Sequence, residues 1–588
     1  MKKRWRMSQA NIGLQEVFCR DLEVSPITAQ LLINRGLVDV NGASSFLRPD
    51  LKELHDPFLL KDMERAVGRI KAALDKKEKI AVYGDYDVDG TTSAAILYLF
   101  FKELGVEVRT YIPDRRKEGY GLNAGAISLL SEEGVTLIIT VDCGISNFDE
   151  IGFASSIGTD IIVTDHHEPG FRRPPAFAVI NPRQEGCAFP FKGLAGCGVA
   201  FNLLMALRAR LRGTPWLDKG EPNLKKYCGL VSIGTIADMA PLLDENRILV
   251  SHGLKEIESP WRPGLAALKE ASGIRANAPV DAEKIAFQIA PRINAAGRLT
   301  QASLALRLLV TDDPVEAASC ASDLDRENAA RQLLEVEILK DAVSIMSSPQ
   351  AALPEKAGDK GIVLYSDKWH PGVIGIVASR LVEMFGKPTV LISLDKEVGK
   401  GSVRSIKSFD ILKALSSCEG VLLRYGGHRM AAGLTLARMN IEEFKKEFAG
   451  YLNRHLTEDD LIPEITMDAL VSLNEMDLKL MSEIESLAPH GVANRVPLFC
   501  MTGAEVLGTE VVKVRHLRFK LKHNGVRNSA IGFNMAPLHP VKGDGFAVAF
   551  SASINEWRGV KSLGLRIKDI KPCPRMVKSG DGAANILT

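Results

Sequence analysis

Acidic residues crowd one short segment of the chain. Asp85, Asp87 and Asp89 lie between an apolar run at 80–83 and a helix-forming run at 93–101. This pattern predicts a tight turn at the carboxyl end of a buried strand. Carboxylates crowded in such a turn repel one another, which costs free energy unless a cation compensates their charge. The segment therefore predicts a site for divalent metal ions.

The same segment matches two other kinds of loop only in part. A calcium-binding EF-hand loop needs an acid at its twelfth position, where Ile96 stands, and a helix before it. A nucleotide-binding P-loop needs a lysine that this segment lacks, and its acids would repel phosphate without metal. An acidic surface turn that caps a helix remains an alternative.

Two later segments end in residues of the same kind. Asp142 follows an apolar run at 135–141, and Asp165, His166 and His167 follow another at 160–164. Apolar strands that alternate with helices indicate a parallel sheet covered on both faces. Because active sites of such sheets gather at the carboxyl ends of the strands, we expect these side chains to meet. The alternative is that each cluster is a separate solvated loop.

Asp238 completes the candidate metal centre. It stands among apolar and small residues, where a carboxylate is rarely left unpaired, although a helix-end cap would also explain it. Carboxylates combined with imidazole favour Mn²⁺ or Mg²⁺. The candidate ligands are Asp85, Asp87, Asp89, Asp142, His166 and Asp238, which is more than one tetrahedral site needs.

This ligand set fits two divalent cations about 3.5–4 Å apart, the geometry of phosphodiester hydrolysis by a metal-activated water. Asp142 is our candidate for the bridging carboxylate, because it follows a different strand than the turn at Asp85. His167 neighbours a ligand, and we expect it to contact the phosphate rather than the metal. A neutral surface histidine is the alternative for His167.

Glycine-rich basic segments predict contacts to phosphate. Residues 291–300 offer Arg292, Asn294 and Arg298 among small residues, and two further segments lie at 399–405 and 425–433. Glycine lets backbone N–H groups face an anion, and Arg, Ser and His add donors. The candidates in the two later segments are Ser402, Arg404, Gly426, Gly427 and His428. Ordinary surface turns are the alternative for all these segments.

Residues from about 460 to 575 read as β-structure with a basic stripe. Its cations are Lys513, Arg515, Arg518, Lys520 and Lys522, and their phase changes between Arg515 and Arg518, which predicts a bulge or turn. With Phe519 adjacent, this face suits single-stranded nucleic acid. A solvated edge strand that resists aggregation is the alternative.

The composition is that of a soluble protein of several domains. A chain of 588 residues corresponds to about three or four domains. The net charge of +2 confines any basic surface to local patches. Nine scattered cysteines without a C-x-x-C pair, no visible signal peptide and no membrane-length apolar run predict a cytoplasmic location and no membrane contact.

Four motifs resemble those of the DHH superfamily of phosphoesterases. They are Gly84-Asp85-Tyr86-Asp87-Val88-Asp89-Gly90, Val141-Asp142-Cys143-Gly144, Thr164-Asp165-His166-His167 and Gly234-Thr235-Ile236-Ala237-Asp238. Residues 401–405 and 426–428 resemble the DHHA1 domain of that superfamily. The segments at 112–115, 118–121 and 291–298 are similar to the RecJ family of bacterial single-stranded-DNA-specific exonucleases.

The resemblance implies a multidomain α/β fold. A parallel-sheet DHH domain is joined by a long helix to a smaller α/β DHHA1 domain, and an OB-like β-barrel follows. The boundaries that we predict are a helical N-terminal region at 1–76, the DHH domain at 77–310, the helix at 311–347, the DHHA1 domain at 348–457, the OB-like domain at 458–575 and a tail at 576–588.

The resemblance also implies an activity: 5′→3′ hydrolysis of single-stranded DNA to 5′-mononucleotides in recombination and repair. By this analogy, Asp85, Asp87, Asp142, His166 and Asp238 bind two metals, and Asp89 either binds metal or only shapes the turn. Asp165 would orient the two histidines. Arg115, Ser402 and Arg404 would hold the 5′ end, and Arg292, Arg298 and His428 the backbone near the scissile bond.

The implied partners are single-stranded DNA, a single-strand-binding protein and a DNA helicase, for a protein that acts as a monomer. One departure from the family pattern lies at 487–499, where His490 replaces a more usual aromatic residue and Arg495 a proline. Two rival interpretations are a DHH-type phosphatase of short oligonucleotides and a catalytically inactive DNA-binding scaffold. The length of the chain argues against the first, and the intact ligand set against the second.

Overall fold

The computed structural model describes residues 3–114, 118–299, 302–347, 360–557 and 559–573. These residues form two compact units. Among the described residues, the larger unit contains residues 7–325 and 466–573, and the smaller unit contains residues 326–465 and 3–6. The long helix α15 (Pro314–Ser347) begins in the larger unit and ends in the smaller one, close to its predicted bounds.

A parallel sheet forms the centre of the larger unit. Its order is β3 (Val108–Tyr111), β2 (Lys79–Gly84), β4 (Val135–Val141), β5 (Asp160–Thr164) and β6 (Ala178–Ile180). The chain runs from β2 outward to β3 and then crosses to β4 on the other side of β2, so the strand order reverses between β2 and β4. A crevice at the carboxyl ends of two such strands is the usual ligand site of an open α/β sheet.

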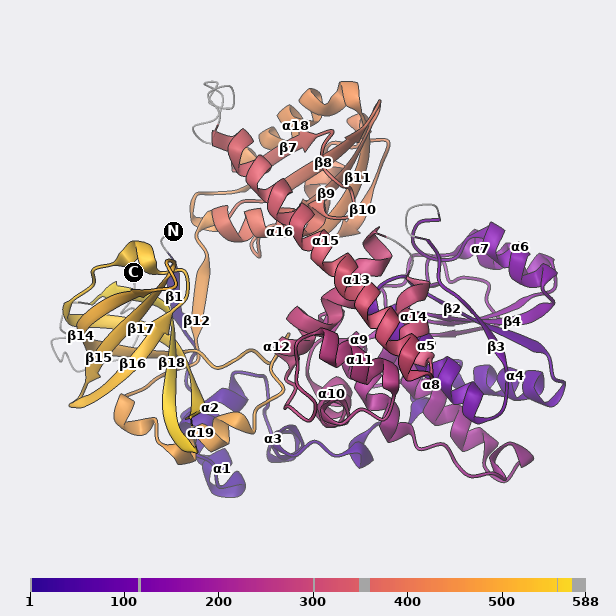
Figure 1. The fold of residues 1–588 in the computed structure, drawn as a ribbon, viewed down its shortest axis with the longest axis horizontal. Coiled ribbons are helices and arrows are strands. Elements are labelled where there is room, and N and C mark those ends of the chain that lie inside the picture. Colours follow the sequence, from indigo (N-terminus) through magenta and orange to yellow (C-terminus); the bar gives the residue numbers. More distant parts are fainter. Residues whose placement is uncertain (1–2, 115–117, 300–301, 348–359, 558, 574–588) are drawn as a thin grey trace. The chain divides into compact units, whose positions relative to one another are not determined.

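Helices cover both faces of this sheet. Figure 1 shows α6 (Ala124–Glu132) and α7 (Phe148–Ser156) on one side, and α4 (Met63–Asp75) and α8 (Gly196–Leu211) on the other. The buried helices α5 (Val88–Glu103) and α9 (Cys228–Ala237) belong to the same core as α4 and α8. With both faces buried, the strands carry near-continuous apolar residues, which confirms the predicted parallel sheet.

Further helices complete this part of the larger unit. They are α10 (Asp244–Glu258), α11 (Pro263–Ala271), α12 (Ala282–Lys284), the π-helical turn η5 (Ile285–Ile289), α13 (Ala290–Leu299) and α14 (Ser303–Val310). The segment 291–299 is thus helical rather than a surface turn.

The C-terminal strands close into a barrel. Their order is β14 (Phe499–Val512), β15 (His516–His523), β16 (Val526–Gly532), β18 (Val560–Pro572) and β17 (Gly543–Trp557), and β17 pairs back with β14. The short strand β13 (Ala469–Leu470) pairs in parallel with the start of β14, and α19 (Leu478–Glu485) precedes the barrel. The predicted OB-like barrel is therefore confirmed, with a helix in addition to the strands.

The N-terminal helices pack on the barrel. Residues of α1 (Ile12–Leu22), α2 (Pro26–Ile33) and α3 (Val40–Leu47) share one apolar core with α19 and the barrel strands. The region 1–76 is helical as predicted, but it also contains the strand β1 (Arg4–Met7), which pairs with β12 (Glu464–Met467).

A buried arginine joins the metal-bearing part of the larger unit to the barrel. Arg247 of α10 donates hydrogen bonds to the carbonyl oxygens of Phe46, Ser486, Leu487 and Ala488, at 2.7–3.1 Å. Its guanidinium also stacks on the Phe46 ring, 3.8 Å from the centroid. No carboxylate pairs with it among the described residues, and burial lowers the pKa of Arg247 to about 9. The carbonyls at the end of α19 thus depend on this side chain for a donor.

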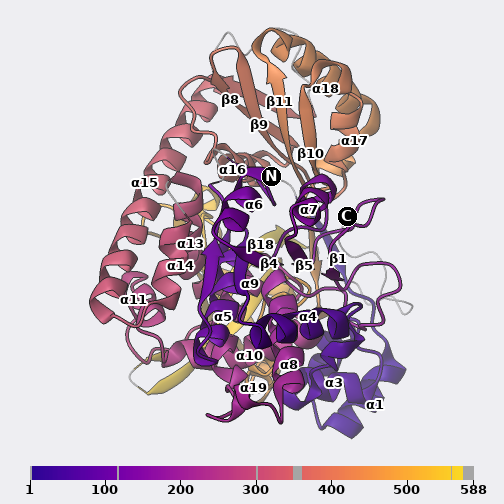
Figure 2. The same cartoon turned by 90° about the vertical axis from the view of Figure 1, so that its right-hand side faces the viewer.

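The smaller unit is a mixed α/β sandwich. Its sheet has the order β10 (Arg424–His428), β11 (Ala431–Ala437), β9 (Val398–Arg404), β8 (Thr389–Asp395) and β7 (Ile362–Ser366). Figure 2 shows α17 (Ile411–Ser416) and α18 (Ile441–His455) beside one face of this sheet, and α15 and α16 (Ile374–Phe385) beside the other. The glycine-rich segments that could have been turns are therefore paired strands.

No helix among the described residues is both long and apolar enough to cross a bilayer. The predicted domain boundaries and the cytoplasmic location stay predictions.

Candidate metal centre

The turn after β2 places its carboxylates at the amino end of α5. Asp87 caps this helix and accepts a hydrogen bond from the Gly90 N–H at 3.0 Å. Asp85 is 3% exposed. A side chain at Gly90 would approach the Asp85 backbone to 2.5 Å, so only glycine allows the turn to close this tightly. The turn is therefore shaped to bring acids together rather than to separate them.

Asp142 enters the site from the end of β4 in a strained conformation. Its φ of 62° lies in the left-handed region, which costs a non-glycine residue roughly 1–2 kcal/mol. The Asp142 N–H donates to the Thr164 carbonyl at 3.0 Å, and the Tyr120 hydroxyl donates to the Asp142 carbonyl at 3.3 Å. Strain of this kind persists only where the surroundings enforce it, and it is typical of functional sites.

His166 faces the carboxylates of three separate segments. Its Nε2 lies 3.1 Å from Asp142 Oδ1, 3.8 Å from Asp238 Oδ2 and 3.9 Å from Asp89 Oδ2. Among the described residues, His166 Nε2 and Asp142 Oδ1 are both buried without a hydrogen-bond partner. Lone pairs that converge in this way fit a metal ion rather than a hydrogen bond.

Ligand atoms form three overlapping groups within the described residues. They are Asp85, Asp87 and Asp142; Asp89, His166 and Asp238; and Asp142, His166 and His167, with the ligand atoms of each group within 4.8 Å of one another. The first two groups share no residue, which fits two ions. Asp142 lies in the first group and 3.1 Å from His166 of the second, a position that fits the predicted bridge.

The electrostatics of the cluster favour a bound cation. Burial and the charges of Asp89, Asp87 and Asp85 raise the pKa of Asp142 well above its ordinary value. Burial and the charges of Asp89 and Asp87 raise the pKa of Asp238 to about 8. Burial lowers the pKa of His166, which keeps its imidazole neutral and able to ligate. A divalent cation would relieve the repulsion that, after burial, contributes to the raised pKa values of Asp142 and Asp238.

Asp89 has a structural task in addition to its place in the cluster. Its carboxylate accepts hydrogen bonds from the N–H groups of Gly196 at 2.6 Å and Cys197 at 2.8 Å, at the start of α8. It therefore anchors that helix, while Oδ2 still lies 3.9 Å from His166. These hydrogen bonds support a structural role for Asp89. Its distance from His166 also allows Asp89 to be a metal ligand.

Asp165 orients His167. Its Oδ1 lies 2.8 Å from His167 Nδ1 and accepts the His166 N–H, and its Oδ2 accepts the Ile145 N–H. Although burial opposes its charge, these hydrogen bonds hold the pKa of Asp165 below its ordinary value. Burial by itself would lower the pKa of His167, but the hydrogen bond with Asp165 and the charge of Asp165 raise this pKa to about 9.

Tyr120 is a site residue that motif reasoning did not select. Its hydroxyl lies 3.1 Å from His167 Nδ1, and burial together with the nearby acids raises the pKa of Tyr120 far above its ordinary value. The only sequence signal was the similarity of the segment 118–121 to a family pattern. A lone tyrosine between glycines carries no recognisable chemistry until the fold brings it beside His167.

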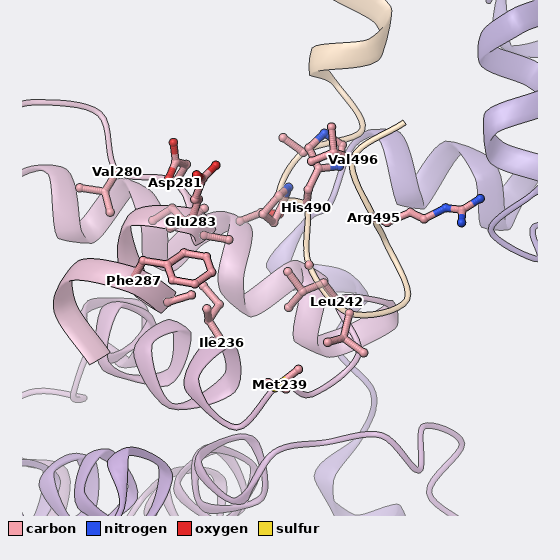
Figure 3. A pocket seen from close by; sticks show the side chains of 18 of the residues that line it. Ile236, Met239, Leu242, Val280, Asp281, Glu283, Phe287, His490, Arg495 and Val496 are labelled. Atoms are coloured by element: carbon pink, nitrogen blue, oxygen red, sulfur yellow. The ribbon is translucent and has the colours of Figure 1, made fainter. Parts of the chain in front are cut away.

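Helix α13 carries the predicted phosphate-binding residues past the metal turn. A Cβ at Gly297 would lie 2.6 Å from the Tyr86 carbonyl, so the helix touches the turn at this glycine. Arg298 is the next residue of α13 after Gly297. Arg292 instead pairs with Asp325 at 2.8 Å, and Asn294 lines a groove between α13 and the segment 486–498 (Figure 3). Arg115 lies outside the described residues.

The predicted phosphate-binding residues of the smaller unit meet on one sheet face. Strand pairing aligns Gly426 with Gly433 and Ser402, and His428 with Ala431 and Arg404. Positions two apart along a strand point to the same side, so Ser402, Arg404 and His428 share that side. Ser402 and Arg404 lie beside Gly375 at the amino end of α16, a place that favours anions. Gly427, whose φ is 145°, lies between Gly426 and His428 on the edge strand β10.

The basic stripe of the barrel is largely exposed, and part of it is neutralised. Lys513 to Arg515 form the turn between β14 and β15, which accounts for the change of phase. Arg518 pairs with Glu510 at 3.2 Å and Lys522 with Glu505 at 3.0 Å, whereas Lys520 has no carboxylate partner among the described residues. Phe519 is fully buried on the inner side of the barrel, so the expectation that it lies beside these cations is wrong.

Comparisons with known proteins cover most of the chain. Residues 79–235 match the family model of the DHH family, N-terminal domain, residues 358–454 that of the DHHA1 domain, and residues 467–569 that of the RecJ OB domain. The single-stranded-DNA-specific exonuclease RecJ of Bacillus subtilis (strain 168) is 36% identical over 574 residues, which are 97% of this chain and 71% of that protein.

Two crystal structures of RecJ from Thermus thermophilus are similar to the whole chain. The structure in complex with Mn²⁺ has a TM-score of 0.82 at 34% identity and covers 98% of this chain and 81% of its own. The structure in complex with Mg²⁺ has a TM-score of 0.77 at 32% identity and covers 98% and 80%.

Proposed function

Because the chain belongs to the RecJ family of single-stranded-DNA-specific exonucleases, we propose that it hydrolyses single-stranded DNA from the 5′ end. The products would be 5′-mononucleotides, and the role would be in recombination and repair. The observation that carries this proposal is the convergence of Asp142, His166 and Asp238 with the turn at Asp85 into one buried cluster.

We assign two divalent cations, Mn²⁺ or Mg²⁺, to this cluster. Asp85, Asp87 and Asp142 would hold one ion, and His166 and Asp238 the other, with Asp142 between them. When bound, such ions activate water near neutral pH and stabilise the charge that develops on the phosphate.

The remaining residues of the site position the substrate. His167, held by Asp165 and Tyr120, would donate to a phosphate oxygen. Arg298 on α13 would hold the DNA backbone, and the face with Ser402, Arg404 and His428 would bind the 5′ end. We also propose, from the family resemblance, that the protein is a cytoplasmic monomer that works with a single-strand-binding protein and a DNA helicase.

The rival activities account for less of the chain. A phosphatase of short oligonucleotides would not need the barrel, and an inactive scaffold would not need a complete ligand cluster. The test is nucleotide release from 5′-labelled and 3′-labelled single strands in Mn²⁺ and in Mg²⁺. We expect early release of the 5′ label only. Equal rates from 3′ ends would refute the polarity, and activity on dinucleotides alone would favour the phosphatase.

A further inference from the structure

An arginine outside the four metal-binding motifs stands at the edge of the metal centre. Arg183 lies three residues after the end of β6, which pairs in parallel with β5, the strand before His166 and His167. The carboxyl ends of parallel strands meet at one edge of a sheet. Arg183 therefore shares this edge with the metal-binding segments.

The backbone of Arg183 is fixed to the segment that carries the two histidines. The side chain of Asn181 between them is fully buried. Its amide nitrogen donates to the His167 carbonyl at 2.9 Å, and its amide oxygen accepts the Arg183 N–H at 2.8 Å. Arg183 therefore keeps its place relative to His167, whichever partner its side chain has.

The guanidinium of Arg183 is held on two sides and open on a third. Its Nε donates to the Lys192 carbonyl at 3.2 Å, and its Nη1 donates to Glu168 Oε1 at 2.5 Å. Nη2 has no partner among the described residues, and 33% of the side chain is exposed. A guanidinium held in this way can donate to a further anion without losing its orientation.

The ion pair with Glu168 does not by itself explain this arrangement. Glu168 is 64% exposed, and an ion pair of exposed groups contributes little to stability because water and salt screen it. A phosphate that approaches Arg183 would meet a carboxylate partner that can turn into solvent. Phosphate is also an anion whose geometry the guanidinium matches with two parallel hydrogen bonds.

The positive charge of Arg183 reaches the ligands of the metal centre. Burial has the largest effect on the pKa values of His166 and Asp238, and the charge of Arg183 lowers both of them. Since Coulomb interactions weaken with distance, Arg183 lies near the ligand group that contains these two residues. A phosphate beside that group would be attracted by the charge of Arg183.

The place of Arg183 in the sheet indicates which phosphate it meets. Tyr120, in the segment after β3, contacts His167 from the side that the family resemblance assigns to the 5′ end. Because β3 and β6 are the two edge strands of the sheet, Arg183 lies on the opposite side of the metal centre. A strand whose 5′ end lies on the β3 side therefore runs over the metals toward Arg183.

We propose that Arg183 binds the phosphodiester that follows the scissile bond and so holds the strand against the metal centre. The inference rests on the proposed function, because it concerns the same substrate in the same site. Arg183 then acts on strands that have a second phosphodiester. It does not act on a 5′-phosphorylated dinucleotide, in which the scissile bond is the only phosphodiester.

The test combines Arg183→Ala with a substrate that lacks one charge. The substrate is a 5′-phosphorylated oligothymidylate in which an uncharged methylphosphonate replaces the second phosphodiester. Release of the first nucleotide in Mn²⁺ gives kcat/KM for the normal and the modified strand. We expect the modification to lower kcat/KM of the wild type roughly 10-fold, and Arg183→Ala to do the same on the normal strand. The two changes together should cost no more than either change alone.

Matched variants separate phosphate binding from a structural role. Glu168→Gln removes the carboxylate partner but keeps Arg183, and it should retain or raise kcat/KM on the normal strand. Arg183→Lys keeps a charge without the paired N–H groups and should lose less than Arg183→Ala. Arg212→Ala removes an exposed arginine that pairs with Glu221 and should change kcat/KM on neither strand. All four variants should keep the melting temperature of the wild type, because each replaces a partly exposed side chain.

An equal loss caused by Arg183→Ala on the normal and the modified strand, or no loss on either, would overturn the assignment. The assignment also fails if Glu168→Gln reproduces the loss of Arg183→Ala, because Arg183 would then serve only the ion pair. A wild-type protein that releases no nucleotides in Mn²⁺ would refute the proposed function itself. An active wild type with an unresponsive Arg183 would refute only this inference.

Discussion

The metal centre and the basic stripe of the barrel handle charge in opposite ways. The carboxylates of Asp85, Asp89 and Asp142 are almost fully buried. Burial and the neighbouring negative charges raise the pKa values of Asp87 and Asp142. The cations of β15 point into solvent, and two of them pair with glutamates on the adjacent strand. The first arrangement is costly without a ligand, whereas the second is stable by itself.

This difference separates the residues that do chemistry from those that guide the strand. Buried like charges cannot rearrange, so each atom of the metal centre has a fixed task. Exposed cations interact through screened charge and substitute for one another. We therefore expect large, position-specific effects at the metal centre and small, salt-dependent effects on the barrel.

The largest effect should come from Asp142→Asn. Because Asp142 is the candidate bridge between two ions, we expect nucleotide release from single-stranded DNA to fall by at least about 10³-fold. Binding of the strand should remain. The metal-free variant should melt at the wild-type temperature or above, because one negative charge leaves the crowded cluster. Full activity of this variant would contradict the two-metal centre.

Arg247→Met tests the contact of α10 with Phe46 and the end of α19, which joins the metal-bearing part of the larger unit to the barrel. The substitution leaves several buried carbonyls without a donor, and we expect the free energy of unfolding to drop by about 3 kcal/mol. Denaturant unfolding measures this change. Arg212→Met removes an exposed arginine that pairs with Glu221 and should cost less than about 0.5 kcal/mol. Equal stability of the two variants would show that the joint does not depend on Arg247.

Asp165→Asn addresses the support of the metal centre. The amide keeps the shape but loses the charge that orients His167, and we expect kcat to fall about 10–100-fold with little change in KM. Asp149→Asn, at an exposed position on α7, is the matched control. A change confined to KM would assign Asp165 to substrate binding instead.

The smallest effects should appear on the barrel, where two lysines of one strand can be compared. Lys520→Ala should reduce the slope of log affinity against log salt by about 0.7, as expected for one lost phosphate contact. Lys522→Ala should reduce it less, because Glu505 already compensates that charge. Titrations at several salt concentrations measure both slopes. A larger effect for Lys522 would reverse the assignment.

Much of the fold could be predicted from local patterns. The strands that precede Asp142 and His166 are short and apolar. The alternation of such strands with helices predicts a parallel sheet without any further information. The long helix was predicted to within a few residues because an acidic cap and a proline precede a stretch without breakers. The glycine-rich strands β9 and β10 were harder, since glycine favours turns and only pairing makes them strands.

The candidate site divides in the same way. Asp85, Asp142 and His166 could be named from the sequence, because acidic and histidine side chains at the carboxyl ends of parallel strands converge by topology. Asp238, which follows the buried helix α9, could be named because a carboxylate among apolar residues needs a partner. Tyr120 and Arg183 could not, because each belongs to a segment with no chemistry of its own. Phe519 was expected beside the basic stripe, but side chains alternate along β15, so Phe519 points to the inner face while Arg518 and Lys520 point outward.

The sequence by itself determined which residues can hold metal and that Asp85, Asp142 and His166 follow strands of one sheet. Residue type and the alternation of apolar strands with helices suffice for that, because both can be read from local patterns. Only the tertiary structure decided the double task of Asp89, the hydrogen bond between Tyr120 and His167, and the contact of Gly297 with the metal turn. Each of these joins segments far apart in the chain, and such contacts depend on how helices pack, which no local pattern encodes.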